Sequence, residues 1–290
     1  MDCRGKLGRV RACPTHLQVL TLPNPTLPNP ALPNPTLATA AAGRGVWIAL
    51  PTYNERENLE PLIASVLDQL PAAHLLVIDD GSPDGTGELA DALSRANARI
   101  AVLHRASKEG LGEAYRAGMR WILAQPDCDA IVQMDCDFSH APDEIRLLLS
   151  SLDAGADLAL GSRLVAGGSS PGLSWRRRLV SRGGSLFART VLGLPYRDLT
   201  GGFKAWRRDF LARLGIDGSY ANGYGFQIEM TRRAHQLSAS ITEVPITFRD
   251  RIAGSSKMSG AIVGEAALMV LRLRFRAERS VHAGRRPSAP

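Results

Sequence analysis

Cysteine and aromatic residues are scarce in this 290-residue sequence, which has 4 cysteines and 6% Phe, Trp and Tyr. None of the cysteines has the paired spacing of a zinc or redox site: Cys3, Cys13, Cys128 and Cys136. This excludes a disulfide scaffold, a zinc ribbon and a Cys-x-x-Cys redox motif. The N-terminal residues also lack the apolar core and small-residue cleavage site of a secretory signal. We therefore expect a cytoplasmic protein with reduced thiols.

No apolar run is long enough to cross a bilayer, for which a helix needs about 20 largely uncharged residues. The C-terminal apolar run, 261–271, is shorter than that and contains Glu265. It leads into a basic cluster: Arg272, Arg274 and Arg276. Apolar and basic residues together favour a helix that lies at an interface. We predict an amphipathic helix over 258–276 that docks on a membrane surface or on a separate integral-membrane subunit, followed by a disordered tail over 277–290.

Residues 1–43 differ in composition from the rest of the chain. The unit Leu-Pro-Asn-Pro recurs at 22–25, 27–30 and 32–35, and an Ala-rich stretch follows. Proline at this density blocks helices and sheet ladders, so we predict a disordered or polyproline-like tail. It is either a ligand for a proline-reading module or the result of a start codon placed too early. We assign it no catalytic role.

The charge balance is basic, with 35 Lys and Arg against 28 Asp and Glu and a formal net charge of +7. Such a balance favours an anionic partner: nucleic acid, an acidic membrane face or a substrate that carries phosphate. The aromatic residues are few and no nucleic-acid reader motif is present, which makes nucleic acid the weakest of the three. The hydrophobic fraction of 44% is that of a folded protein.

Short apolar runs alternate with longer amphipathic ones after the N-terminal tail. The strand-like runs are 46–50, 74–79, 100–103 and 130–134. The helix-like runs are 56–69, 84–95 and 110–124. This alternation predicts βαβ units and therefore an α/β fold with a mostly parallel sheet flanked by helices. We expect a single catalytic domain over 44–257, with its ligand beyond the carboxyl ends of the strands.

Polar loops follow the first two predicted strands, at 51–55 and 79–86. The first loop has no Gly-x-Gly-x-x-Gly fingerprint, which argues against a dinucleotide-binding dehydrogenase. A carboxylate such as Asp79 or Asp80 can instead accept a hydrogen bond from a nucleobase or ribose. Other residues of the second loop, Asp84 among them, are equally suited to capping the next helix.

The fourth predicted strand leads into Asp135-Cys136-Asp137. Hard divalent cations take oxygen ligands and usually keep several waters, so one or two carboxylates plus substrate phosphates suffice. Strand periodicity puts Asp135 and Asp137 on one face, too far apart for joint chelation unless the chain bends there or a water mediates one contact. The pair is our candidate site for Mg²⁺ or Mn²⁺.

Several longer blocks carry a family resemblance, and they occur in a fixed order. They are PTYNERENL (51–59), VIDDGSPDGT (77–86), GLGEAYRAG (110–118), MDCDFSH (134–140), GSR (161–163), SRGG (181–184), DLTGGFK (198–204), GYGFQIEM (223–230) and VPITFRDRIAGSSKMS (244–259). Over 46–259 the chain resembles the polyprenyl-phosphate (dolichyl-phosphate) mannose synthases of glycosyltransferase family 2. The resemblance implies a GT-A, Rossmann-like fold. It also implies inverting transfer of mannose from GDP-mannose to a polyprenyl monophosphate.

The resemblance also implies roles for individual residues. The positions that match the guanosine site are Pro51, Tyr53, Glu55, Asp79 and Asp80. Asp135 and Asp137 match the metal and diphosphate site, and Ser139 stands where some relatives carry a further ligand, Gln. The basic residues expected around the donor and acceptor phosphates are Arg163, Arg251 and Lys257. With Asp137, these three form the predicted catalytic set.

The acceptor in such a reaction is already an anionic phosphate oxygen, so it needs no strong general base. Basic side chains and a cation must instead offset the repulsion between the two phosphorylated reactants. We leave His104, His140 and Glu229 without a catalytic assignment. The alternatives are a polyprenyl-phosphate glucosyltransferase that uses UDP-glucose, a silent sugar-nucleotide-binding module and, more distantly, a basic nucleic-acid-binding protein.

A second basic and apolar stretch covers 174–197. Its apolar residues recur near a helical period among arginines, which suits an element lying against anionic lipid. An amphipathic helix packed on the core is the competing interpretation. Gly183 and Gly184 are expected to weaken or break the helix midway. Together with 258–276, this stretch places the protein at the periphery of the cytoplasmic face of a membrane.

Overall fold

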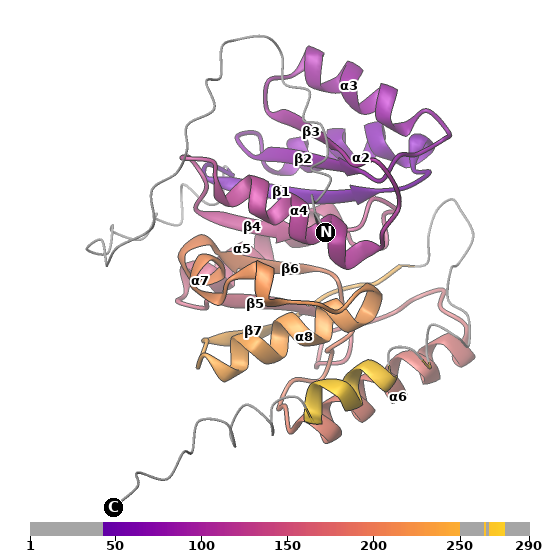
Figure 1. Ribbon diagram of the computed structural model, residues 1–290, viewed down its shortest axis with the longest axis vertical. Helices are drawn as coiled ribbons and strands as arrows, with labels where there is room; N and C mark the ends of the chain where they lie inside the picture. The colour runs from indigo at the N-terminus through magenta and orange to yellow at the C-terminus, as the bar shows by residue number, and fades with distance from the viewer. Residues whose placement is uncertain (1–42, 250–263, 265–266, 276–290) are drawn as a thin grey trace, which may run out of the picture.

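The computed structural model describes residues 43–249, 264 and 267–275, which form an α/β domain around one sheet (Figure 1). Its strands are β1 (Val46–Thr52), β2 (His74–Asp79), β3 (Ile100–His104), β4 (Ala130–Gln133), β5 (Leu158–Ser162), β6 (Lys204–Arg207) and β7 (Ile241–Pro245). They are ordered β3-β2-β1-β4-β6-β5-β7. Only β6 runs antiparallel to its neighbours, β4 and β5. The mostly parallel α/β sheet is confirmed.

The helices alternate with the strands along the chain. They are α2 (Arg56–Gln69), α3 (Thr86–Ala96), α4 (Leu111–Leu123), α5 (Ile145–Asp153), α6 (Trp175–Leu192), α7 (Arg208–Leu214) and α8 (Gly223–Gln236), with 3-10 turns η1 (Pro142–Glu144) and η2 (Ile216–Gly218). Residues 267–275 form one more helix, drawn in yellow in Figure 1. The seven runs predicted between 46 and 134 all form the expected element, with ends that differ by up to two residues.

Helices cover both faces of the sheet, which explains why its central strand is apolar at nearly every position. In β1, Ile48 and Leu50 belong to a core that they share with α2, α3 and α5. Trp47 and Ala49 point the other way, into a core shared with α4, α7 and α8. The alternating side chains of one strand therefore join two helical layers, and the polar loops remain at the carboxyl edge.

Helix α6 lies outside these two layers and runs unbroken through Gly183 and Gly184, contrary to our expectation of a break. Two glycines cost about 1–2 kcal/mol of helix stability in total. The ends of the helix offset this cost, because the Ser174 side chain accepts from the Arg177 N–H and Gly193 ends the helix in a left-handed conformation. Ala188 of α6 also packs in a third core with residues of α8 and of the 267–275 helix.

A buried lysine joins the sheet to α8. Lys204 of β6 is 1% exposed, and its Nζ donates to the Gln227 carbonyl oxygen at 2.7 Å and to Thr231 Oγ1 at 3.0 Å. Burial lowers the pKa of Lys204 from 10.5 to about 7, against the opposing effect of Asp198. At neutral pH the amine is therefore close to its own pKa, and its hydrogen bonds to Gln227 and Thr231 fix α8.

We predict that Lys204→Met changes how stability depends on pH. Between about pH 7 and pH 10 the unfolded wild-type chain binds more protons at this side chain than the folded one does, so its free energy of unfolding rises with pH. Methionine removes this dependence. The difference in free energy of unfolding, variant minus wild type, should fall steadily over that range in urea titrations. A difference that stays constant with pH would contradict the lowered pKa.

Candidate active site

The loops that follow β1 and β2 are hydrogen-bonded to each other. The Asn54 N–H donates to Ser82 Oγ at 3.1 Å, and the Glu55 N–H donates to Thr86 Oγ1 at 3.0 Å. Asn54 has a φ of 59°, a conformation that asparagine tolerates better than most residues. The two loops therefore form one rigid shelf at the carboxyl edge of the sheet.

Three of the predicted nucleotide-binding residues lie on the first loop of this shelf. Pro51 and Tyr53 are half-buried, and the Lys108 ammonium lies 3.8 Å from the centre of the Tyr53 ring. Glu55 accepts a hydrogen bond from the Asn58 side chain at 2.9 Å. The negative charge of Glu55 also helps to raise the pKa of the buried Cys136 thiol, after the larger effect of burial. The first loop is thus close to the loop that follows β4.

Asp79 and Asp80 end β2 and have different partners. Asp79 accepts from the hydroxyl and the N–H of Ser82, at 2.5 and 3.2 Å, and so closes its own loop. Asp80 is paired with Arg105, and burial raises its pKa more than this arginine lowers it. Each carboxylate can accept further hydrogen bonds, so a contact with the nucleotide stays a prediction. Asp84 Oδ1 accepts from the Thr86 N–H at 3.0 Å, next to the start of α3, but the N-cap residue is Gly85 and the cap has no side-chain hydrogen bond.

The two aspartates of the predicted metal site lie in a tight turn, because β4 ends at Gln133. The Asp135 N–H donates to His140 Nδ1 at 3.1 Å, and the Ser139 N–H donates to Asp137 Oδ1 at 3.0 Å. Phe138, which lies between Asp137 and Ser139 in the sequence, has a φ of 59°. The chain therefore bends at this point. On a straight strand the two carboxylates would be too far apart to bind one cation, so the bend is needed for a shared site.

Both carboxylates act on the same buried neighbours. Burial raises the pKa of Tyr115, and Asp135 and Asp137 raise it further. Burial lowers the pKa of His140, which the two aspartates oppose and Arg163 reinforces. The neutral His140 ring stacks on Phe203, with centroids 4.8 Å apart. His140 thus holds the turn that carries Asp135.

Arg163 follows β5 and is held by a buried carboxylate. Its Nε donates to Asp198 Oδ2 at 2.8 Å, and its Nη2 donates to Thr200 Oγ1 at 3.1 Å. The guanidinium lies 4.7 Å from the centre of the Phe248 ring. The side chain of Arg163 is only 11% exposed, so it is not a solvated surface charge. Asp198 fixes the direction in which this cation points.

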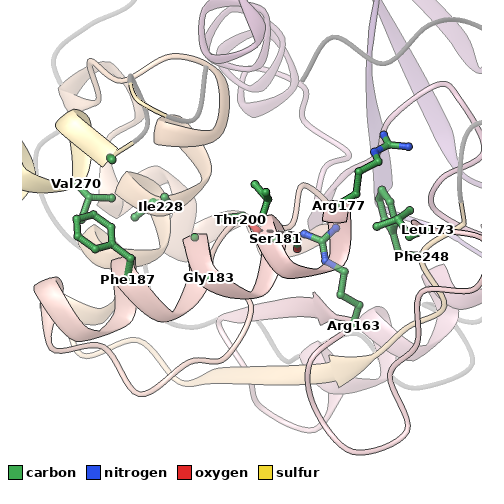
Figure 2. Close-up of a pocket in the computed structure, with 13 residues that line it drawn as sticks. Arg163, Leu173, Arg177, Ser181, Gly183, Phe187, Thr200, Ile228, Phe248 and Val270 are labelled. Carbon is green, nitrogen blue, oxygen red and sulfur yellow. Dashed lines mark hydrogen bonds between the residues drawn. The ribbon is translucent and has the colours of Figure 1, made fainter. Parts of the chain in front are cut away.

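A cavity of about 280 Å³ opens between Arg163, α6, α8 and the 267–275 helix (Figure 2). One end of it is polar, with Arg163, Arg177, Ser181 and Thr200. Toward the other end the walls are apolar, and the bare backbone of α6 at the glycine pair forms part of the lining. Gly183, Phe187, Ile228 and Val270 lie in this part, and Gly184 and Ala267 also line the cavity. Such a space suits an elongated ligand with an anionic head and an apolar tail.

Two of the predicted catalytic residues, Arg251 and Lys257, lie outside the described residues. The segment before them runs past the metal turn, because the Arg249 N–H donates to the Ser139 carbonyl at 3.2 Å. Sequence reasoning assigned no role to Asp198, Thr200 or Phe248, which surround Arg163. Asp198 and Thr200 are in the DLTGGFK block, which was the only signal for them.

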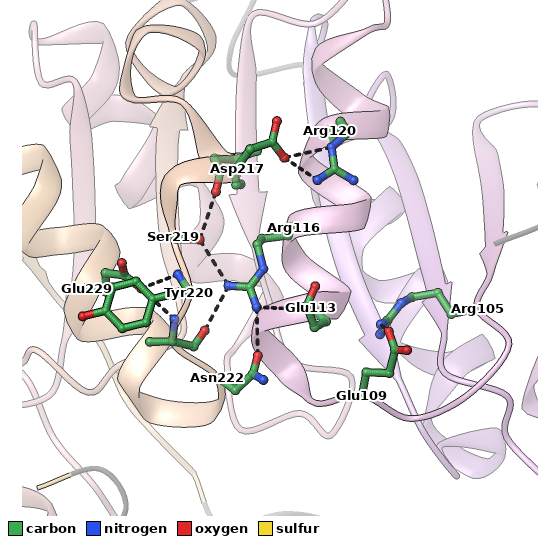
Figure 3. Close-up of polar contacts among 12 residues, drawn as sticks. Arg105, Glu109, Glu113, Arg116, Arg120, Asp217, Ser219, Tyr220, Asn222 and Glu229 are labelled. Carbon is green, nitrogen blue, oxygen red and sulfur yellow. Dashed lines mark hydrogen bonds and ion pairs between the residues drawn. The ribbon is translucent and has the colours of Figure 1, made fainter. Parts of the chain in front are cut away.

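The turn before α8 is fixed by a network centred on Arg116 of α4 (Figure 3). This buried guanidinium donates to the Ala221 carbonyl at 3.0 Å and to Asn222 Oδ1 at 3.0 Å. Glu229 accepts from the N–H groups of Tyr220 and Ala221. Glu229 is therefore a structural residue, a role that the sequence analysis had left open. The network as a whole sets where α8 begins.

Helix α6 and the 267–275 helix pack on a common core, and both carry exposed apolar side chains, which together we call the apolar-basic face. Its large apolar residues are Trp175, Leu179, Val180, Leu186, Phe187, Leu268, Leu271 and Phe275. Exposed arginines lie among them: Arg178, Arg182, Arg272 and Arg274. Single exposed apolar residues are ordinary, whereas a group of this size is typical of a protein or membrane contact.

Neither a spanning helix nor a protein-only metal cluster is found within the described part of the chain. No helix there is long and apolar enough to cross a bilayer. No group of three or more His, Cys, Asp or Glu side chains there is arranged to hold a metal ion. Any cation at Asp135 and Asp137 would then need ligands from elsewhere, such as substrate phosphates.

Solved structures with a similar fold include a glucosyl-3-phosphoglycerate synthase from Mycobacterium tuberculosis. Its complex with phosphoglyceric acid aligns with a TM-score of 0.61 and 23% identity, over 83% of this chain and 85% of that one. Its complex with Mn²⁺, UDP and glucosyl-3-phosphoglycerate aligns with a TM-score of 0.58 and 23% identity, over 84% and 85% of the two chains. At this identity the likeness shows the fold alone.

Sequence comparisons identify closer relatives. A polyprenol monophosphomannose synthase of Mycolicibacterium smegmatis is 46% identical over 80% of this chain and 88% of its own length. An undecaprenyl-phosphate mannosyltransferase of Micrococcus luteus is 46% identical over 77% of this chain and 91% of its own length. Residues 47–215 match the family described as glycosyl transferase family 2. With the GT-A-like sheet and its loops in place, this protein is a glycosyltransferase that belongs to family 2.

Proposed function

We propose that this glycosyltransferase moves mannose from GDP-mannose to a polyprenyl monophosphate, with inversion at the anomeric carbon. The observation that carries the proposal is the cavity beside Arg163, which has a cationic end near the Asp135–Asp137 turn and an apolar end along α6. Two relatives at 46% identity have names that specify mannose transfer to polyprenyl or undecaprenyl phosphate. The cavity fits that acceptor class, because it offers a place for both a phosphate and a hydrocarbon chain.

The proposed reaction requires little proton transfer by protein side chains. The acceptor phosphate oxygen attacks the anomeric carbon, the bond from that carbon to the donor diphosphate breaks, and its electron pair leaves with GDP. The nucleophile is already anionic, so no general base is needed. Arg163, held by Asp198, binds and orients the acceptor phosphate beside the donor. Arg251 and Lys257 are proposed to add positive charge there.

The donor lies across the shelf formed by the loops after β1 and β2. Pro51, Tyr53 and Glu55 on the first loop, with Asp79 and Asp80 on the second, are proposed to hold guanosine. The shelf is stiff, since the two loops are hydrogen-bonded to each other, so it costs little entropy to order on binding. The second loop is further fixed by Asp79 and by the ion pair of Asp80 with Arg105.

Asp135 and Asp137 fit a hard cation such as Mg²⁺ or Mn²⁺. They supply oxygen ligands at a bend of the chain, and their number leaves coordination positions for donor phosphates and water. When bound there, the cation would neutralise charge on the departing diphosphate. Two hydrogen bonds fix the turn that carries the two carboxylates: His140 Nδ1 accepts from the backbone N–H of Asp135, and the Asp137 carboxylate accepts from the Ser139 N–H.

The apolar-basic face is proposed to rest on the cytoplasmic face of a membrane, where a polyprenyl phosphate resides. Trp175 of α6 is 66% exposed, and Phe275 of the 267–275 helix is 61% exposed. Both helices contribute residues to the cavity wall. Exposed arginines among these apolar residues match an anionic lipid surface. A separate integral-membrane subunit that covers the same face is the other outcome that a binding experiment must distinguish.

The direct test is to incubate the purified protein with radiolabelled GDP-mannose, Mg²⁺ and polyprenyl phosphate, and then to extract lipid. We expect label in the lipid phase that mild acid releases as mannose. UDP-glucose serves as the competing donor in a parallel reaction. Lipid labelled from UDP-glucose alone would replace the proposal with glucosyl transfer. No labelled lipid from either donor, with salt-sensitive binding of nucleic acid, would overturn it.

Asp137→Asn should reduce transfer by at least a hundredfold while the protein stays folded. The substitution removes one of two negative ligands from the site but keeps the side-chain shape and the oxygen that accepts from Ser139. Initial rates at several Mn²⁺ concentrations measure the effect. Asp143→Asn, on the exposed Asp143 of η1, is the matched control and should have wild-type rates. Near-normal turnover of the Asp137 variant would exclude the assigned metal site.

Gly184→Leu should raise the KM for long-chain polyprenyl phosphate by about tenfold or more, a change of about 1.4 kcal/mol. No atom lies within 4 Å of a Cβ added at Gly184, so the helix accepts the side chain, which then projects toward the cavity. The KM for GDP-mannose should not change. Gly184→Ala should give a smaller effect in the same assay. Equal KM values for the lipid in both variants and the wild type would show that the chain does not pass this wall.

Arg182→Gln combined with Arg272→Gln should weaken binding to vesicles that contain anionic lipid. Each arginine near such a surface contributes about 1 kcal/mol, so the pair is expected to lower the partition coefficient by about thirtyfold at low salt. Co-sedimentation measures it. Arg44→Gln with Arg95→Gln removes equal charge from exposed positions outside the face and serves as the control. An equal loss in the control pair, or tight binding to uncharged vesicles, would argue against the proposed orientation.

A further inference from the structure

One buried amide has a place in the fold but no partner in it. Gln227 of α8 is 1% exposed, and neither Nε2 nor Oε1 makes a hydrogen bond. Its backbone is fixed, because the Gln227 carbonyl accepts from Lys204 Nζ at 2.7 Å and from Thr231 Oγ1 at 2.9 Å. A buried polar group without a partner destabilises the folded state. An apolar side chain of the same size would remove that cost, so the amide calls for a functional explanation.

The amide points at the metal turn across Gly202. A Cβ placed on Gly202 would lie 3.6 Å from Gln227 Nε2, 3.6 Å from His140 Cε1 and 3.7 Å from Asp135 Oδ1. These three side chains therefore surround one point that glycine leaves without a side chain. The φ of Gly202 is outside the left-handed region, so the backbone conformation does not itself require glycine there. The open space between the amide and the carboxylate is what glycine provides.

The group that can satisfy the amide must come from inside the protein. Solvent reaches neither polar atom of Gln227, so a sugar hydroxyl or a phosphate cannot contact them in this arrangement. Asp135 is half-buried, and its carboxylate faces the buried Tyr115 hydroxyl, whose pKa it helps to raise. His140 holds only the backbone N–H of Asp135, so the side chain of Asp135 is not fixed by that bond. An uncharged amide can orient such a carboxylate without competing with a cation for its negative charge.

We propose that Gln227 is a positioning residue for Asp135. Its Nε2 donates to the Asp135 carboxylate when that carboxylate turns to hold the cation, and the other carboxylate oxygen then faces the cation. The inference rests on the proposed function, because it assumes that Asp135 is a metal ligand. It also gives a role to the elements that place α8, namely Lys204 and the Arg116 network (Figure 3).

Gln227→Met tests the proposal with two measurements, the melting temperature and the Kd for Mn²⁺. The first should show no loss of stability and the second a loss of metal affinity. Methionine has nearly the same size and removes the unpaired amide, so the metal-free protein should melt at the wild-type temperature or higher. The Kd for Mn²⁺ in the presence of GDP, measured by electron paramagnetic resonance of the free ion, should rise about 10–100-fold. A lower melting temperature would show that the amide has a structural partner. An unchanged Kd would show that it does not serve Asp135.

Gly202→Ala tests the same contact from the other side. The added methyl group meets its neighbours at ordinary contact distances, so the variant should fold and melt like the wild type. The methyl separates the amide from the carboxylate and should weaken Mn²⁺ binding as Gln227→Met does. Wild-type Mn²⁺ affinity in Gly202→Ala would contradict the proposal. If the wild-type protein itself binds no Mn²⁺ with GDP, the proposed function fails as well, which distinguishes the two.

Gln133→Met is the matched control for the stability readout. Gln133 is also a fully buried glutamine, but its Oε1 accepts from Trp206 Nε1 at 2.6 Å. Its replacement leaves a buried indole N–H unpaired, so the melting temperature should fall. Gln133 Nε2 has no partner, so the two amides differ in the oxygen alone: Gln133 Oε1 has a partner and Gln227 Oε1 has none. The two Gln→Met changes are therefore expected to differ in sign, because only the Gln133 change breaks a hydrogen bond. Equal falls in both variants would count against a functional role for Gln227.

Discussion

The site depends on the tight turn between Asp135 and His140. A strand that continued straight would separate the two carboxylates, whereas here the strand ends at Gln133 and the chain bends. The bend is kept by hydrogen bonds at both ends, from the Asp135 N–H to His140 and from the Arg249 N–H to the Ser139 carbonyl. Because β4 is at the centre of the sheet, this turn lies near the loops after β1 and β2 on one side and near Arg163 on the other.

The two reactants are served by different parts of the architecture. The parallel strands β1, β2 and β4 align their carboxyl ends and present the loops proposed to hold the nucleotide. The segment before the antiparallel strand β6 carries Asp198 and Thr200, which fix Arg163. Helix α6 and the 267–275 helix extend the cavity from Arg163 to an apolar surface. In the proposed function, a phosphorylated lipid would reach the donor from the surface where its hydrocarbon chain remains.

The sequence predicted the local features of this fold well. Alternating apolar runs indicated β1 to β4 with their helices. The position of Asp135 and Asp137 after a buried strand indicated the candidate metal site, which stays a prediction. Interactions between distant segments left no such pattern. The cavity is formed by residues from 163 to 270, the partner of Arg163 is 35 positions away, and the continuity of α6 depends on packing against other helices. Composition near Gly183 alone therefore predicted a break that tertiary contacts prevent.

The central claim is that two carboxylates and the donor diphosphate hold one cation jointly. The most direct measurement is the Kd of the wild-type protein for Mn²⁺, by electron paramagnetic resonance, with and without GDP. If the ligands are shared, GDP should tighten Mn²⁺ binding at least tenfold, and Mn²⁺ should tighten GDP binding by the same factor. A Kd for Mn²⁺ that GDP does not change would contradict the account.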